Sequence, residues 1–237
     1  SCAAVVGVIV EKTIIRKLYN RDHLDQVLVT FALILFFSEL IRWIFGAFPL
    51  YLDVPKILNG SIEIFDGIYY SKYRLFIIFV GLIIATFLFF LIGKTNLGIQ
   101  IRAGQYDREM ISALGVNISK LYTLLFGIGA ALAGLAGALI GTIQSVEVGM
   151  GEPILILAFV IIVIGGIGSI KGAFIASLLV GLVDTLGRFL IPWVLQTVTN
   201  PSDAMSVGSA IGSMLIYILM AIILILKPTG LYGKQLS

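Results

Sequence analysis

The stretch "LYTLLFGIGAALAGLAGALIGT", residues 121–142, decides the fold of this chain, and it contains no charged residue. It is as long as the roughly 20 apolar residues that an α-helix needs to cross a bilayer. Backbone groups in hydrocarbon must be hydrogen-bonded within their own segment, so a run of this kind folds as a helix. The sequence therefore predicts a membrane-spanning helix here.

The composition of the whole chain agrees with a membrane protein. Of its 237 residues, 59% are hydrophobic and 12% are charged, and the mean hydropathy is +1.08. Soluble domains contain about 25% charged residues, so lipid must solvate most of this surface. The net charge of +3 comes from basic residues in short loops beside apolar runs. That placement is typical of membrane proteins and not of a nucleic-acid-binding surface.

Further apolar runs flank the first one, at residues 27–46, 73–93, 153–168, 173–191 and 208–226. Together they predict an all-α polytopic membrane protein with about six complete transmembrane helices. The run 153–168 is short and ends in "GGIGS", so it is either a full span or a broken, re-entrant helix. Residues 1–10 are apolar but too few to span. We interpret them as the tail of a partial N-terminal span in an N-terminally truncated chain.

The charged loops predict the orientation. Residues 11–22, the loop 94–120 and the C-terminus are basic, whereas residues 49–72 and 146–152 are acidic on balance. Basic loops stay in the cytoplasm. We therefore expect a multi-pass protein of a bacterial or archaeal cytoplasmic (inner) membrane, with residues 94–120 inside.

Small residues recur every four positions in the run 121–142. They are Gly129, Ala133, Gly137 and Gly141. This spacing places them on one helical face, where backbones of neighbouring helices can approach closely. The pattern predicts a helix-packing face.

Charges also occur inside predicted spans. Glu39 lies three residues before Arg42, and Asp184 lies four before Arg188. Charges at depth are costly and often functional, but a structural ion pair is the commoner outcome at this spacing. The candidates for a translocation path are Glu39, Asp184, Gly165, Gly166 and Gly168.

The sequence predicts no catalytic residue, metal site or cofactor in this chain. Cys2 is the only cysteine and His23 the only histidine. The segment "IGKT" resembles part of a phosphate-binding loop, but that loop needs a glycine where Leu88 stands. ATP and magnesium, if they are used, must bind to partner subunits.

Residues 101–120, "IRAGQYDREMISALGVNISK", are a short polar helix between two apolar runs. Met110, Ala113 and Leu114 form a narrow apolar stripe among charged residues. Gly115 is a predicted C-cap and Asn117 a predicted start of the next helix. The stripe is small for a helix lying on lipid, so it favours docking into a groove of a protein.

The stretches "RAGQYDREMISALGVNISKLYTLLFGIGAALAGLAGAL", "FVIIVIGGIGSIKGAFIASLLVGLVDTL" and "LKPTGLYG" resemble the branched-chain amino acid permeases of ATP-binding-cassette (ABC) transporters. The resemblance implies one permease domain over residues 1–237, with a cytoplasmic coupling loop at 94–120. It implies inward transport of branched-chain or related amino acids. It also implies two ATP-binding subunits, a second permease subunit (identical or homologous) and an extracytoplasmic substrate-binding protein as partners. The coupling residues are then Asp107, Met110, Ala113, Leu114 and Gly115.

Three alternatives remain open at this stage. ABC permeases for urea or short amides have similar loops. A stand-alone secondary transporter or channel would need ion-coupling carboxylates, for which Asp184 is a candidate, and would need no docking helix. A membrane scaffold without transport would need no pathway between its spans.

Overall fold

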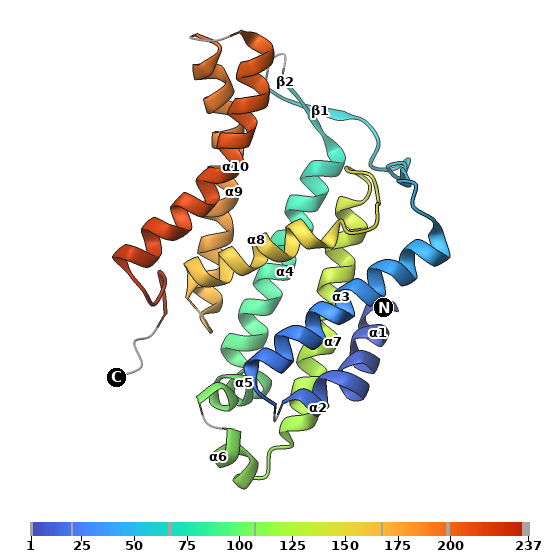
Figure 1. Cartoon of the computed structure of the whole chain (residues 1–237), viewed down its shortest axis with the longest axis vertical. Helices are drawn as coiled ribbons and strands as arrows, with labels where there is room; N and C mark the ends of the chain where they lie inside the picture. The colour runs from blue at the N-terminus through green and yellow to red at the C-terminus, as the bar shows by residue number, and fades with distance from the viewer. Residues whose placement is uncertain are drawn as a thin grey trace. The chain divides into compact units, whose positions relative to one another are not determined.

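The structure of the chain is a computed structural model. It describes residues 2–19, 21–65, 68–106, 108–166, 168–197 and 200–233. Within them the chain is mainly helical, as predicted, and five helices are long and apolar enough to cross a membrane. The elements gather into two compact units, Ser1–Gly151 and Glu152–Ser237, and Figure 1 labels them along the chain.

Each predicted span falls on one helix. The spanning helices of the first unit are α3 (His23–Phe45), α4 (Lys72–Lys94) and α7 (Ile118–Ile140). The second unit holds the shorter α8 (Gly151–Gly165) and the spanning helices α9 (Ile170–Leu195) and α10 (Pro201–Leu226). The remaining elements are α1 (Cys2–Val10), the π-helical turn η1 (Glu11–Ile15), α2 (Arg16–Leu18), β1 (Ser61–Phe65), β2 (Ile68–Ser71), α5 (Asn96–Tyr106) and α6 (Arg108–Ala113).

Helix α1 packs along α7 in the first unit (Figure 1). Small residues make this contact close. A Cβ added at Gly127 would lie 2.9 Å from Val8 Cγ2, and one added at Gly134 would lie 2.5 Å from the Cβ of Ala3. The predicted face of α7 is the adjacent one. A Cβ added at Gly129 or Gly137 would have no neighbour outside its own helical turn within 4 Å, whereas one added at Gly141 would lie 2.8 Å from Val146 Cγ2. A partner helix for that face stays a prediction.

The loop 49–72, for which we predicted no secondary structure, contains a β-hairpin. Strands β1 and β2 are antiparallel, with Ser61 opposite Ser71. The chain just before the hairpin pairs with the loop after α7, because Leu50 and Val146 exchange backbone hydrogen bonds of 2.9 and 2.8 Å. A two-residue bridge therefore ties the two loops that the charge pattern places outside.

The second unit packs around a core of five buried side chains. They come from α8, α9 and α10: Val160, Ile164, Ala176, Val180 and Ile216. Helices α9 and α10 also approach each other through glycine. A Cβ at Gly212 would lie 2.9 Å from the backbone nitrogen of Arg188, and one at Gly208 would lie 2.8 Å from Pro192. Pro192 lies inside α9, which continues to Leu195.

The segment after α10 covers the C-terminal end of α8. The backbone N–H of Leu231 donates to the Ile164 carbonyl (2.8 Å), and that of Tyr232 donates to Gly165 (3.1 Å). Carbonyls that would end α8 unpaired are thereby satisfied. Helix α8 is unbroken over its 15 residues, about 22 Å at 1.5 Å per residue. This is shorter than the roughly 30 Å hydrocarbon core.

Candidate functional site

The loop that the charge pattern places in the cytoplasm begins by folding back onto α4. Thr95 precedes α5, and its hydroxyl accepts from the Gly98 backbone N–H at 3.3 Å. Gly98 packs directly on the end of α4, since an added Cβ would lie 2.1 Å from the Ile92 carbonyl oxygen. The Arg102 guanidinium donates to that same carbonyl. The last turn of α4 is therefore fixed to α5, and any side chain at position 98 would separate them.

The polar helix predicted over residues 101–120 is two helices, since α5 ends at Tyr106 and α6 begins at Arg108. Asp107 lies outside the described residues. Helix α6 ends in a Schellman motif at Gly115. The Gly115 N–H donates to Ser112 (3.0 Å) and the Val116 N–H donates to Ile111 (3.3 Å), the paired bonds of this motif. Gly115 has φ +85°, so the predicted C-cap is confirmed.

The next helix starts immediately afterwards. The Asn117 side chain accepts from the Lys120 backbone N–H at 3.0 Å and caps α7, as predicted. Only three residues, Leu114 to Val116, lie between the end of α6 and the Asn117 cap. Short, hydrogen-bonded connections of this kind leave α6 little freedom relative to α7. A hollow of about 470 Å³ lies beside the turn, with Leu97 of α5 and Leu121 of α7 in its wall.

The apolar stripe of α6 is exposed. Met110 is 63% and Leu114 is 76% accessible, and Ala113 is also exposed. Ile111, in the same helix, is buried at 6%. The helix thus anchors itself through Ile111 and presents its other apolar side chains outward. Exposed apolar side chains grouped beside a rigid turn are typical of an interaction surface.

A polar cluster fixes the other end of α1 to the start of α7. Glu11, on the π-helical turn, is completely buried. Its carboxylate accepts from the Thr123 hydroxyl at 2.7 Å and lies 3.3 Å from the Arg16 guanidinium. Arg16 also donates to Thr123 at 2.7 Å. The acid is therefore paired and hydrogen-bonded, as a buried charge requires.

Tyr19 completes this cluster. Its hydroxyl donates to Glu11 at 3.3 Å, and its ring meets Tyr122 edge-on with centroids 5.3 Å apart. Burial, and secondarily the Glu11 charge, raise the pKa of the Tyr19 phenol to about 12. The phenol therefore keeps its proton at neutral pH and remains a donor.

The charges predicted at depth form ion pairs within their own helices. Glu39 and Arg42 are 2.8 Å apart on α3, and Asp184 and Arg188 are 2.7 Å apart on α9. All four side chains are partly or fully exposed on their units. A contact between these acids and a substrate stays a prediction.

The predicted path glycines have close backbone neighbours. A Cβ at Gly165 would lie 2.5 Å from the Gly172 carbonyl carbon, and one at Gly166 would lie 2.4 Å from the Gly233 nitrogen. Gly166 and Gly168 have φ of +94° and +82°. These glycines shape the α8–α9 turn and its contact with the C-terminal segment. A role in a path stays a prediction.

Sequence reasoning missed several residues that the structure brings together. The Gly208–Gly212 pair of α10 has the four-residue spacing of close helix contacts, so the signal was present. Glu11 and Thr123 carry no comparable signal, because their partnership joins positions distant in sequence.

Comparison with known proteins gives consistent results. Residues 2–224 match the family "Branched-chain amino acid transport system / permease component". The chain is 30% identical to the high-affinity branched-chain amino acid transport system permease protein BraD of Pseudomonas aeruginosa, over 76% of this chain and 55% of that protein. It is 27% identical to LivH of Escherichia coli K12, described as a permease protein of the same kind of system, over 98% of this chain and 71% of LivH.

An archaeal relative is more distant. The probable branched-chain amino acid transport permease protein LivH of Methanocaldococcus jannaschii is 25% identical over 97% of this chain and 71% of its own length. The chain thus spans about half of BraD and about seven tenths of each LivH protein. No solved structure matches the chain significantly.

Proposed function

Because the chain belongs to the permease family of branched-chain amino acid transport systems, we propose that it is the membrane-spanning subunit of an ATP-driven importer. It moves branched-chain or related amino acids inward across the cytoplasmic membrane. The relatives' names, which specify branched-chain amino acid transport, and the five spanning helices support this function.

In the proposed complex, partner subunits provide ATP hydrolysis and substrate delivery. Two ATP-binding subunits hydrolyse ATP with magnesium, a second permease subunit completes the membrane part, and an extracytoplasmic binding protein delivers the amino acid. In this arrangement the chain itself is not an enzyme. Its task is to convert movement of the ATP-binding subunits into movement of the spans.

The exposed stripe of α6 carries this proposal. Met110 and Leu114 are presented to solvent at 63% and 76%, where a groove of an ATP-binding subunit can receive them in the helix-in-groove manner. The Schellman turn at Gly115 and the Asn117 cap join α6 rigidly to α7. A displacement of α6 is therefore passed to α7. Asp107 and Ala113 belong to the same proposed docking surface.

Movement of α7 reaches α1 through the polar cluster. Glu11, Arg16 and Thr123 bond the two helices, and small residues hold them close over the rest of their length. The two helices are therefore expected to move as one body.

Two acids inside predicted spans are candidates for the translocation path, Glu39 in the first unit and Asp184 in the second. The Asp184 side chain is only 31% exposed. Charged pairs at this depth avoid lipid, so we propose that both acids face a water-filled path or protein.

Reconstitution tests the function. The full-length protein is assembled in vesicles with the second permease subunit, the ATP-binding subunits and the binding protein. Uptake of labelled leucine is then measured with and without ATP. We expect uptake only with ATP and all subunits present. Urea and acetamide are the comparison substrates, and their preferential uptake would favour the amide-permease alternative. Leucine uptake by the permease alone, driven by an ion gradient, would refute the proposal in favour of a secondary transporter.

A further inference from the structure

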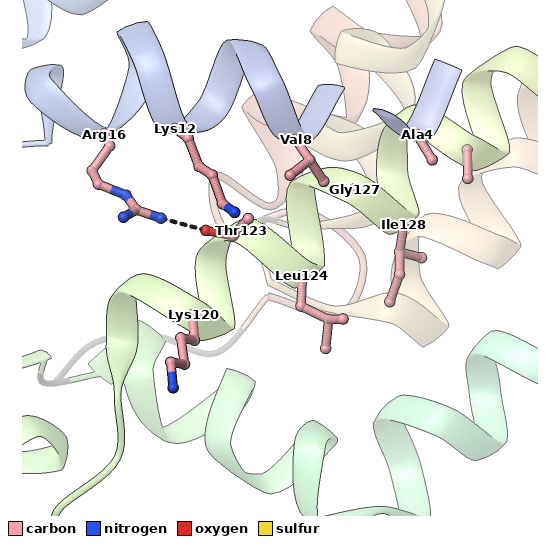
Figure 2. Close-up of a pocket in the computed structure, with 10 residues that line it drawn as sticks. Ala4, Val8, Lys12, Arg16, Lys120, Thr123, Leu124, Gly127 and Ile128 are labelled. Carbon is pink, nitrogen blue, oxygen red and sulfur yellow. Dashed lines mark hydrogen bonds between the residues drawn. The ribbon is translucent and has the colours of Figure 1, made fainter. Parts of the chain in front are cut away.

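A groove of about 650 Å³ runs between α1 and α7 in the first unit (Figure 2). Its walls along most of its length are apolar side chains, among them Val8 of α1 and Leu124 and Ile128 of α7. It exists because the two helices meet through Gly127, which leaves no side chain to fill the space beside the contact. A groove with these walls suits a hydrocarbon chain.

One end of the groove is strongly basic. Lys12, Arg16 and Lys120 all line that end. Figure 2 shows the Lys12 amine and the Arg16 guanidinium both directed toward Thr123, while Lys120 extends its amine outward from the mouth. Residues 11–22 and 94–120 are the segments that the charge distribution places in the cytoplasm. The basic end therefore lies at the level of the cytoplasmic headgroups, and the apolar part extends into the membrane.

The basic end of the groove carries an excess of positive charge. Within the described part of the chain, neither Lys12 nor Lys120 forms an ion pair. Arg16 is held in place by the Thr123 hydroxyl at 2.7 Å and by buried Glu11 at 3.3 Å. One acid faces three cations here, so the mouth keeps a surplus of positive charge. A preorganised guanidinium beside free amines is well suited to binding a phosphate.

We propose that this groove binds an anionic phospholipid of the cytoplasmic leaflet. Its phosphate contacts Lys12 and Arg16, with Lys120 at the rim, and an acyl chain lies along Val8, Leu124 and Ile128. From Thr123 to Ala131 at the far end, the groove follows roughly 12 Å of helix, which accommodates the upper part of an acyl chain. Basic pockets between spanning helices on this side of a membrane bind anionic headgroups in general. This inference does not depend on what the protein transports.

Native mass spectrometry of the full-length protein, released from mixed phosphatidylglycerol and phosphatidylcholine vesicles, tests the proposal. We expect one tightly retained phosphatidylglycerol and a clear preference for it over phosphatidylcholine. Each neutralised cation should lower the affinity roughly fivefold, so Lys12→Gln with Lys120→Gln should lower it roughly 25-fold. Lys17→Gln is the matched control, because Lys17 lies in the same basic segment, is exposed and does not line the groove.

The apolar half of the groove is tested separately. Ala131→Leu fills the far end and should weaken lipid retention, whereas Ala136→Leu, at an exposed position of α7 outside the groove, should not. Size-exclusion profiles and circular dichroism identify any variant that fails to fold. Equal retention of the two lipids, equal effects of the Lys17 and Lys12/Lys120 substitutions, or displacement of the lipid by inorganic phosphate alone would overturn the proposal.

Discussion

The Glu11 carboxylate and the Thr123 hydroxyl are 2.7 Å apart, although 112 positions separate them in the sequence. The π-helical turn makes this contact possible, since the Arg16 backbone N–H bonds to the Glu11 carbonyl five residues earlier. A π-bulge shifts the helix register locally and is frequent at functional sites. Here it turns the acid inward toward α7 and brings Arg16 beside it. The first helix is thereby bonded to the start of the helix that leaves the coupling loop.

The Thr123 hydroxyl can be removed without changing the shape of the side chain. Thr123→Val removes the shortest hydrogen bond to the buried Glu11 carboxylate, and a hydrogen bond to a charged group contributes about 1.5–3 kcal/mol. We expect a lower thermal unfolding midpoint for the purified protein in detergent. Thr86→Val is the control, because the Thr86 hydroxyl bonds only to the Leu82 carbonyl on an exposed face. Equal midpoints for the two variants would contradict a structural role for the cluster.

The limits of sequence reasoning follow from how far each interaction reaches. Helix positions, the positive φ of Gly115 and the Asn117 cap were predictable, because each depends on residues within one or two turns. The α1 contact was not, because α7 carries two adjacent stripes of small residues and spacing alone does not choose between them. The structure packs Gly127 and Gly134 against α1 and leaves the stripe through Gly129 and Gly137 open.

In the candidate site, too, local features were predictable from the sequence, whereas contacts between helices were not. The sequence located the apolar stripe of α6, but the burial of Glu11 depends on a partner in another helix. The close approach of Gly98 to Ile92 likewise depends on how α5 folds back on α4. The hairpin in loop 49–72 was also missed. Its short strands, Ser61–Phe65 and Ile68–Ser71, are separated in the sequence by the pair Asp-Gly, which is typical of two-residue hairpin loops, so a signal was present.

The orientation of the chain can be measured directly. In a background in which Cys2→Ser removes the only cysteine, we introduce Asn59→Cys or Ser112→Cys, both at exposed positions. The charge distribution predicts that a membrane-impermeant maleimide added outside intact cells labels position 59 and not position 112. Permeabilised cells should show labelling at both. Labelling of both positions in intact cells would refute the topology.

The two stripes of α7 should respond differently to the same substitution. Gly134→Leu places a side chain where a Cβ alone would be 2.5 Å from Ala3, and overpacking of this kind costs about 1–3 kcal/mol. We expect a lower unfolding midpoint for the single subunit. A Cβ at Gly137 has no such neighbour within 4 Å, so Gly137→Leu should not lower that midpoint but should reduce assembly with the second permease subunit. Normal assembly of the Gly137 variant would show that this face contacts lipid.

A parallel comparison tests the second unit. Gly212→Leu would collide with backbone atoms of α9 at 2.9 Å, which cannot move aside, whereas a Cβ at Gly181 has no neighbour within 4 Å. Both changes replace glycine by leucine within a helix, so the gain in helix propensity cancels. We expect the Gly212 variant to unfold at a lower temperature than the Gly181 variant. The reverse order would mean that α9 and α10 do not pack through Gly212.

Coupling through α6 can be tested by substitutions in its exposed stripe and in the turn that follows it. Leu114 is 76% exposed, so Leu114→Asp should leave the subunit folded. In the assembled importer, however, it would place an unpaired charge in the proposed groove, at a cost of several kcal/mol. Gly115→Val would strain a turn that has φ +85° and misdirect the same helix. In reconstituted vesicles we expect loss of leucine uptake and of substrate-stimulated ATP hydrolysis for both variants, with binding-protein docking unchanged. Leu114→Met keeps an apolar side chain and should retain most uptake. Full uptake with Leu114→Asp would remove α6 from the coupling pathway, because no docked groove could then surround that position.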